Sequence, residues 1–250
     1  MRYFLTYILV ILLPGLAMAQ TGFKAGINYS TISGYQADYD ISSKSKPGFV
    51  AGLTFGGYKD RPGVRFEMLI SQKGNRYSST ATDSFFLNTI IYTVETNYKN
   101  KFTYLDMPLM FTFPASKRFI FEMGPSLGIR LSGKRKGETT VYNKSIIGNQ
   151  IVYTLSENVK YGDEDVFPNF RKHIHTRVKD RQFPDRNPVS TFDLGLNIGA
   201  SYMLSSQLAL QARYSTGLTD IFRNNYPVVN AGQSKEVHKI ISLSVVLLTN

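Results

Sequence analysis

The sequence predicts an all-β protein, an eight-stranded antiparallel up-and-down β-barrel that spans a membrane. Three observations favour this fold: side chains that alternate between apolar and polar over many segments, short turns that alternate with long loops, and an N-terminal segment typical of exported proteins. Successive side chains of a β-strand point to opposite faces, so a period of two separates an apolar face from a polar one. In a membrane barrel the apolar face contacts lipid and the polar face lines the lumen.

The clearest alternation runs from residue 118 to residue 132. Phe119, Phe121 and Met123 fall on one face, whereas Glu122 and Arg130 fall on the other. The same pattern predicts seven further strands. We expect them over residues 23–30, 49–56, 64–77, 104–113, 192–202, 208–218 and after residue 236.

The connections between these strands are short at one end of the barrel and long at the other. Turns are expected at 58–63, 114–118 and 205–207, and loops at 33–46, 79–100, 134–188 and 222–236. The segment 79–100 could form a hairpin beyond the membrane, and 146–155 could form a strand pair of its own. Outer-membrane barrels have short periplasmic turns and long extracellular loops. The pattern therefore predicts that the long loops, 134–188 above all, are extracellular.

Residues 1–19 are predicted to be a cleavable signal peptide. Arg2 precedes an apolar run from Tyr3 to Leu16, and Ala17-Met18-Ala19 is a small-x-small cleavage site. An uncleaved membrane anchor is the alternative, but the run is shorter than the ~20 residues of a spanning helix. Residues 20–250 then form one barrel domain in the outer membrane. A soluble periplasmic barrel is the structural alternative.

Charged residues within the predicted strands all fall on the face opposite the apolar one. They are Lys24, Arg65, Glu67, Asp106, Glu122, Arg130, Asp193 and Arg213. A single Arg or Lys facing lipid near the midplane costs ~2–4 kcal/mol, so these side chains must face the lumen. Because an eight-stranded barrel is only wide enough for its own side chains, we expect a neutral ion-pair network that fills the lumen.

The overall charge suggests an anionic partner in the cell envelope. The formal net charge is +11, and the chain has no cysteine, hence no disulfide and no thiolate-held metal. Export argues against nucleic acid as the partner. We expect outer-membrane lipid and lipopolysaccharide to be the anionic partners.

Six motifs, in order along nearly all of the mature chain, resemble the PorT-like outer membrane β-barrel family of Bacteroidota. They are KPGFVAGL (46–53), SQKG (71–74), YLDMPLMF (104–111), GPSLGIRLSG (124–133), DLGLNIGASY (193–202) and ARYSTGLTDI (212–221). The resemblance implies an eight-stranded outer-membrane barrel, with a founding member linked to type IX secretion. The chain departs from the family in its long segment 134–188 and in the absence of a terminal aromatic residue.

Few residues suggest chemistry, and we expect no catalytic residue, no metal and no cofactor. His173 and His175 share a face of an extended chain but have no third ligand, and Asp163-Glu164-Asp165 lacks the spacing of a calcium loop. His238, near the outer rim, could act with Ser190, Ser215 and Asp193 in a lipid hydrolase or acyltransferase, yet no nucleophile motif surrounds them.

A basic run in the longest loop could bind lipopolysaccharide phosphates or an acidic partner, or could simply be solvated. Its cations are Arg171, Lys172, Arg177, Lys179, Arg181 and Arg186. The leading hypothesis is a non-enzymatic envelope protein, structural or partner-binding, to which the resemblance adds an association with secretion. A small-solute pore and a rim-sited lipid-modifying enzyme are the alternatives.

Overall fold

The structure is a computed structural model that describes residues 20–34, 40–56, 61–85, 90–145, 148–160, 189–221 and 236–249. It contains nine β-strands in these ranges. They are β1 (Thr21–Ser33), β2 (Asp40–Phe55), β3 (Gly63–Phe85), β4 (Ile90–Pro114), β5 (Phe119–Ser145), β6 (Gly148–Lys160), β7 (Phe192–Met203), β8 (Leu208–Gly217) and β9 (Val237–Thr249). No helix in this part of the chain is long and apolar enough to cross a membrane.

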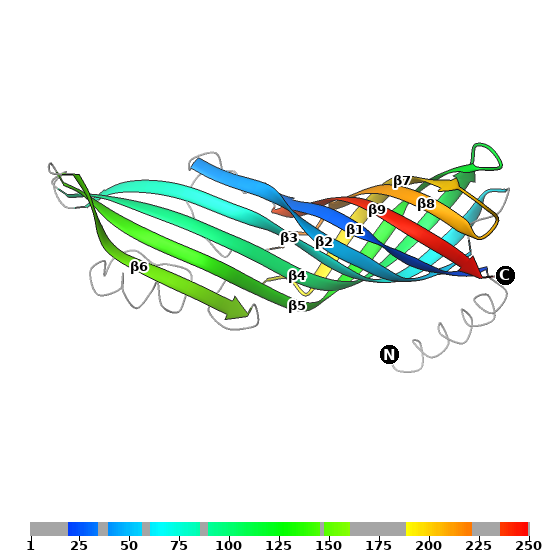
Figure 1. Ribbon diagram of the computed structural model, residues 1–250, viewed down its shortest axis with the longest axis horizontal. Coiled ribbons are helices and arrows are strands. Elements are labelled where there is room, and N and C mark those ends of the chain that lie inside the picture. Colours follow the sequence, from blue (N-terminus) through cyan, green and yellow to red (C-terminus); the bar gives the residue numbers. More distant parts are fainter. Residues whose placement is uncertain are drawn as a thin grey trace.

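Eight of the strands close into a barrel (Figure 1). Neighbours pair in the order β1, β2, β3, β4, β5, β7, β8 and β9, and β9 pairs back with β1. Every pairing is antiparallel, and the closing pair runs from Thr21 opposite Thr249 to Ser33 opposite Val237. Closure leaves no open sheet edge inside the ring. The prediction of an eight-stranded antiparallel barrel is confirmed.

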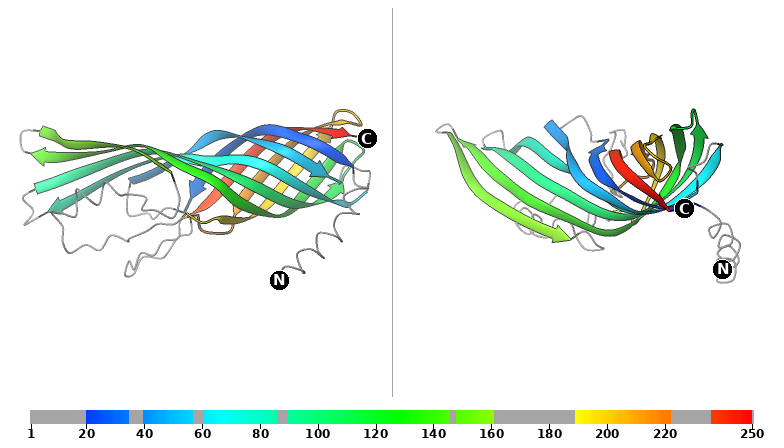
Figure 2. Two further views of the ribbon diagram at one scale, coloured as in Figure 1. Left: turned by 90° about the horizontal axis from the view of Figure 1, so that it is seen from below. Right: turned by 45° about the vertical axis from the view of Figure 1, so that its right-hand side comes forward.

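The remaining strand, β6, lies outside the ring and pairs with the far part of β5. β2 to β6 continue past the barrel as an extended sheet, visible as the long projection in Figure 2. In it β3 and β4 stay paired as far as Phe85 opposite Ile90. We call the part of β2 to β6 beyond the barrel the sheet extension.

Three of the loops that we predicted on this side of the barrel, 33–46, 79–100 and 134–188, have the wrong boundaries, whereas the loop 222–236 ends where β9 begins. Residues 134–145 continue β5 and 148–160 form β6, while 161–188 lie outside the described residues. The segment 79–100 is mostly strand, as its possible hairpin suggested, and β2 already begins at Asp40. The 146–155 segment pairs with β5 and not with itself. Backbone pairing therefore continues where the apolar alternation stops.

Large apolar side chains cover the outside of the barrel. Phe121, Leu196 and Leu210 are 52%, 48% and 45% exposed, as expected for side chains that face hydrocarbon. The side chains that alternate with these apolar ones along each strand point inward and are buried. Along β9, for example, His238, Ile240, Ser242, Ser244, Val246 and Leu248 are buried, whereas Ile241, Leu243, Val245 and Leu247 are exposed.

Candidate functional site

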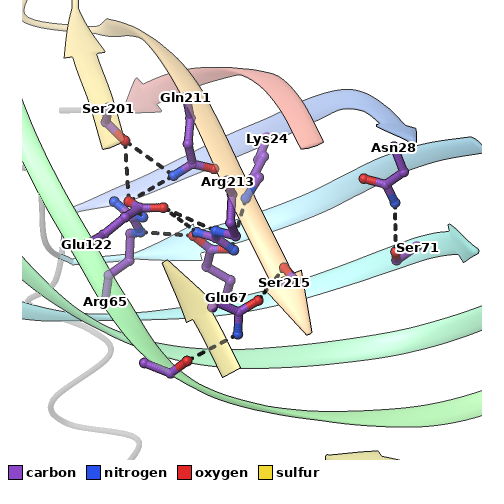
Figure 3. A network of polar contacts seen from close by, with 12 residues as sticks. Lys24, Asn28, Arg65, Glu67, Ser71, Glu122, Ser201, Gln211, Arg213 and Ser215 are labelled. Atoms are coloured by element: carbon purple, nitrogen blue, oxygen red, sulfur yellow. Dashed lines mark hydrogen bonds and ion pairs between the residues drawn. The ribbon is translucent and has the colours of Figure 1, made fainter. Parts of the chain in front are cut away.

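The lumen is the first candidate site, and it contains two clusters of buried ions. The first cluster, which we call the central cluster, consists of Lys24, Arg65, Glu67, Glu122 and Arg213 (Figure 3). Its members come from β1, β3, β5 and β8, so they reach across the lumen from opposite walls. All five side chains are almost completely buried.

Arg213 holds the central cluster together because it contacts both carboxylates. Its Nη1 lies 2.8 Å from Oε2 of Glu67, and its Nη2 lies 2.8 Å from Oε1 of Glu122. Arg65 repeats this arrangement, with its Nε 2.9 Å from Oε1 of Glu67 and its Nη2 bonded to Glu122. Lys24 adds an Nζ at 3.1 Å from Glu67. Arginine's planar fork of donors suits such two-sided contacts.

Neutral side chains complete the hydrogen bonding of Glu122. Gln211 donates to its Oε2 at 3.0 Å, and Ser201 donates to the same oxygen at 3.3 Å. Gly199 lies between Glu122 and Arg213 in the strand register. A Cβ on Gly199 would lie 3.1 Å from the Cα of Arg213. Because glycine has no side chain, the space between Glu122 and Arg213 stays free.

A second group, which we call the upper cluster, lies nearer the sheet extension. Lys73 contacts Asp106 at 2.9 Å and Asp193 at 3.2 Å. The two aspartates lie on either side of Gly128 in the register. A Cβ on Gly128 would lie 2.7 Å from Oδ1 of Asp106, so glycine provides the space in which this carboxylate meets Lys73.

The charges of the two clusters balance each other. The central cluster has three cations and two anions, and the upper cluster has one cation and two anions. Together they contain four charges of each sign. A cavity of about 40 Å³ lies between them, lined by Lys24, Lys73, Asp106 and Arg213 among others. It has room for about three water molecules, each of which needs roughly 10–15 Å³.

Apolar side chains fill the lumen on both sides of the ions. At the end with the short turns, Ile120, Ala209, Val246 and Leu248 form a buried cluster, with Met203 packed against it. At the opposite mouth a second buried cluster consists of Ile32, Phe102, Tyr104, Val189 and Ile221. The lumen thus has three layers, with the ions between two apolar plugs.

The structure brings seven of the eight predicted lumen charges into the two clusters. Arg130 differs: its guanidinium donates to the backbone carbonyls of Ser190 at 3.2 Å and Val189 at 3.0 Å, at the mouth. Lys73, which we did not list, takes part in its place. The sequence contained the signal, because Lys73 shares the inward parity of Arg65 and Glu67. The apolar plugs were missed as well, since the predicted lumen was polar throughout.

His238 lies in the upper part of the lumen, packed against aromatic rings. It is 1% exposed, and its ring centroid is 5.7 Å from those of Phe102 and Tyr104, both in edge-to-face geometry. Among the described residues, neither ring nitrogen has a hydrogen-bond partner. Ser190 Oγ donates to Phe192 and Ser215 Oγ donates to Asn197, so neither hydroxyl is directed at the imidazole.

Several candidates lie outside the described residues. They are the basic run Arg171, Lys172, Arg177, Lys179, Arg181 and Arg186, the pair His173 and His175, the acidic stretch 163–165, and the predicted signal peptide 1–19. In the ranges that are described, no group of three or more His, Asp or Glu side chains is arranged to hold a metal ion.

Comparison with known families agrees with the barrel fold. The family model described as "Outer membrane protein beta-barrel domain" matches residues 15–223. The chain belongs to this outer membrane β-barrel family. Membership supports the outer membrane as its location, while the narrower PorT-like assignment stays a prediction.

Solved structures similar to the chain are outer-membrane barrels at low sequence identity. Ail, the attachment invasion locus protein of Yersinia pestis, solved with the heparin analogue sucrose octasulfate, is 11% identical, with 92% of this chain and 99% of Ail covered and a TM-score of 0.37. Neisserial surface protein A is 11% identical, with 91% and 96% covered and a TM-score of 0.41. OprG from Pseudomonas aeruginosa is 12% identical, with 93% and 94% covered and a TM-score of 0.37. No curated protein matches the chain.

Proposed function

We propose that this protein is a non-enzymatic component of the outer membrane, with a sealed barrel that anchors a partner-binding sheet extension. The observation that carries the proposal is the three-layered lumen. Among the described residues, ions that pair with one another lie between two buried apolar plugs, an arrangement that argues against a continuous path for water or solutes. Such a barrel serves as a rigid membrane anchor.

A small-solute pore is the alternative that the packing of the lumen argues against. Arg65, Glu67 and Glu122 are at most 1% exposed, and Val246 in the turn-side plug is completely buried. Eight-stranded barrels are just wide enough for side chains to fill, whereas conducting porins have sixteen or more strands. The cavity of about 40 Å³ is too small to pass a solute.

Conductance across planar lipid bilayers tests this proposal. We expect no stable unitary conductance from the wild-type protein, because ions would have to displace both plugs and the paired charges. A double variant that opens the turn-side plug, Val246→Gly with Leu248→Gly, provides the comparison in the same bilayers. Reproducible single-channel steps from the wild type would show that the barrel is a pore.

An enzyme at the rim is the second alternative, and the surroundings of His238 argue against it. A general base needs a nucleophile within about 2.6–3.2 Å, but the candidate serines donate elsewhere and Asp193 is paired with Lys73. We expect no hydrolysis or acyl transfer on phospholipid or lipopolysaccharide. An activity that is present in the wild type and abolished in His238→Ala would contradict the proposal.

The proposed partners are anionic components of the envelope. The sheet extension, together with the basic run 171–186, would lie outside the cell, and the short turns in the periplasm, as in other outer-membrane barrels. Lipopolysaccharide phosphates or an acidic protein would match the basic run. A link to secretion follows from the PorT-like resemblance alone. Affinity isolation from native outer membranes, with a deletion of 171–186 as the control, would identify the partner.

A further inference from the structure

The outward face of the sheet extension has a set of cations in direct register across four strands. Lys44 on β2 lies opposite Arg76 on β3, Arg76 opposite Lys99 on β4, and Lys99 opposite Lys136 on β5. One row closer to the barrel, Lys101 lies opposite Lys134. We call these six residues the basic ladder. All six are exposed.

Such an arrangement is unfavourable without a counter-ion. Directly opposite residues on neighbouring strands have their Cβ atoms about 5 Å apart, where like charges destabilise the pair. Within the described part of the chain, no ladder side chain forms an ion pair or a hydrogen bond. Lys46 adds to the excess: its ammonium group donates to the carbonyl of Asn100 at 3.1 Å. Partial burial and the charges of Lys101, Arg76 and Lys99 lower its pKa.

The ladder forms a band of limited height. Towards the barrel the next outward row is neutral, with Gln72, Thr103 and Ser132 in register. Away from the barrel the next row contains Ser78, Asn97 and Glu138. The other face of the same strands is closed to a ligand, because Asn75, Tyr98, Asn100 and Arg135 are buried there. Only the outward face of this band is open to a layer of anions.

The base of the band lies just beyond the headgroup layer of a bilayer. Lys101 is four residues along β4 from the outward, apolar Leu105, a distance of about 13 Å at roughly 3.3 Å per residue. With a strand tilt of about 45°, Lys101 lies about 9 Å beyond the apolar surface, and the row of Lys99, six residues from Leu105, lies about 14 Å beyond it. The headgroup region is about 5–8 Å deep, so the side chains reach it by bending back towards the bilayer. Lysine and arginine side chains can bend towards that layer.

We propose that the basic ladder binds the phosphate groups of phosphorylated glycolipids in the outer leaflet. A phosphate between two neighbouring strands would accept hydrogen bonds from a cation on each, and Arg76, flanked by Lys44 and Lys99, can bind one through two nitrogens. The ladder lies on the same outward face as the lipid-facing surface of the barrel, separated from it by one neutral row, which favours a lipid over a soluble partner. The inference concerns the outward face only, so it holds whether or not the lumen conducts.

Binding of lipid A to the purified full-length protein in mild detergent tests the proposal. The probes are bisphosphorylated lipid A, the same lipid A after dephosphorylation, and inorganic phosphate. The test variant is R76Q/K99Q/K136Q. The control is R61Q/K117Q/R118Q, which removes three exposed cations near the short turns. Unheated and heated gel migration verifies that each variant is a folded barrel.

We expect the wild type and the control to bind bisphosphorylated lipid A alike. The ladder variant should bind it about 100-fold more weakly, because each basic residue at an anionic lipid surface contributes roughly a factor of five. Dephosphorylated lipid A should bind all three proteins at least as weakly as the ladder variant binds the phosphorylated form, because the variant keeps three of the six cations. The difference in affinity for bisphosphorylated lipid A between the wild type and the ladder variant should shrink as the salt concentration is raised.

Two results would overturn the inference. Equal binding of bisphosphorylated lipid A by the folded ladder variant and the wild type would show that the ladder is only a solvated face or is covered by another part of this chain. Displacement of lipid A by inorganic phosphate at equal concentration would show a general anion site that does not select a lipid.

Discussion

Arg213 links two strands in the lumen, because it contacts Glu67 on one and Glu122 on the other, as Arg65 also does. Burying a charge is costly unless it is paired and hydrogen-bonded, and here each carboxylate is shared by two or more cations. The charges were predictable from parity alone. Their partners were not, because sequence does not give the register of strands that are far apart in the chain.

Glu122→Ala should lower the free energy of unfolding by about 3–5 kcal/mol, because it leaves Arg65 and Arg213 buried with a single carboxylate between them. Urea unfolding of the folded barrel in detergent measures this change. Gln211→Ala, which removes only a neutral donor to Glu122, is the control and should cost about 1 kcal/mol. Equal losses for the two variants would argue against a charge network.

Arg130→Ala should have a smaller effect on stability than Glu122→Ala. Arg130 donates to the carbonyls of Val189 and Ser190, so its loss loosens the mouth and leaves both clusters paired. We expect a loss of about 1.5–3 kcal/mol, the range for hydrogen bonds to a charged group. Urea unfolding under the same conditions measures it. A loss as large as that of Glu122→Ala would place Arg130 in the network after all.

The rim near Glu236 should become less stable as the pH rises. Burial, with the charge of Asp220, raises the pKa of Glu236 from 4.5 to about 7. The folded state therefore holds a proton that the unfolded state has lost, and stability falls between about pH 4.5 and pH 7. Hydrogen exchange of the Ile221 amide, which donates to the Glu236 carbonyl at 2.9 Å, should be faster at pH 8 than at pH 5 after correction for intrinsic exchange.

Glu236→Gln is the matched control for this titration. The amide cannot ionise, so protection of Ile221 should no longer depend on pH in this range. A pH dependence that persists in Glu236→Gln would assign the effect to another group.

At the scale of the strands, the sequence predicted the part of each strand that contacts lipid, and of the part beyond it suggested only the hairpin at 79–100. Phe121, Leu196 and Leu210 alternate with polar residues because one face meets hydrocarbon and the other the lumen. In the sheet extension no hydrocarbon is present, so Arg76, Lys99 and the rest of the basic ladder can occupy the outward face. The strands stay hydrogen-bonded to one another there, but no alternation of apolar and polar residues marks them in the sequence.

Removing most of the β5–β6 hairpin should leave the barrel intact. The ring closes through pairs of β5 with β4 and β7 within residues 119–132, and β6 contacts only the extension. We expect a variant with residues 138–157 replaced by a short glycine-serine turn to fold and to keep the heat-dependent gel shift of the wild type. Loss of the folded band would show that the extension is needed to build the ring.

At the scale of the whole molecule, the barrel is an inverted structure with apolar side chains outside and paired ions inside. Its two apolar plugs escaped prediction because Val246, Leu248 and Ile120 are apolar on the inward parity of strands that are apolar on the other side too. A strand that is apolar on both faces gives no sign of which face is the lumen. The closed ring, the even strand number and the outward apolar face were all predictable from the sequence.

The side chains that contact lipid can be identified directly, because the chain contains no cysteine and single cysteines can be introduced for labelling. Single cysteines at Phe121, Leu196, Leu210, Ser126 and Ser215, each given a nitroxide label, can be compared in liposomes for relaxation by oxygen and by a water-soluble nickel complex. We predict strong relaxation by oxygen and little by nickel at positions 121, 196 and 210, and weak relaxation by both at the inward positions 126 and 215. Nickel access at 121, 196 and 210, with oxygen access at 126 and 215, would reverse the two faces of the barrel and contradict the account.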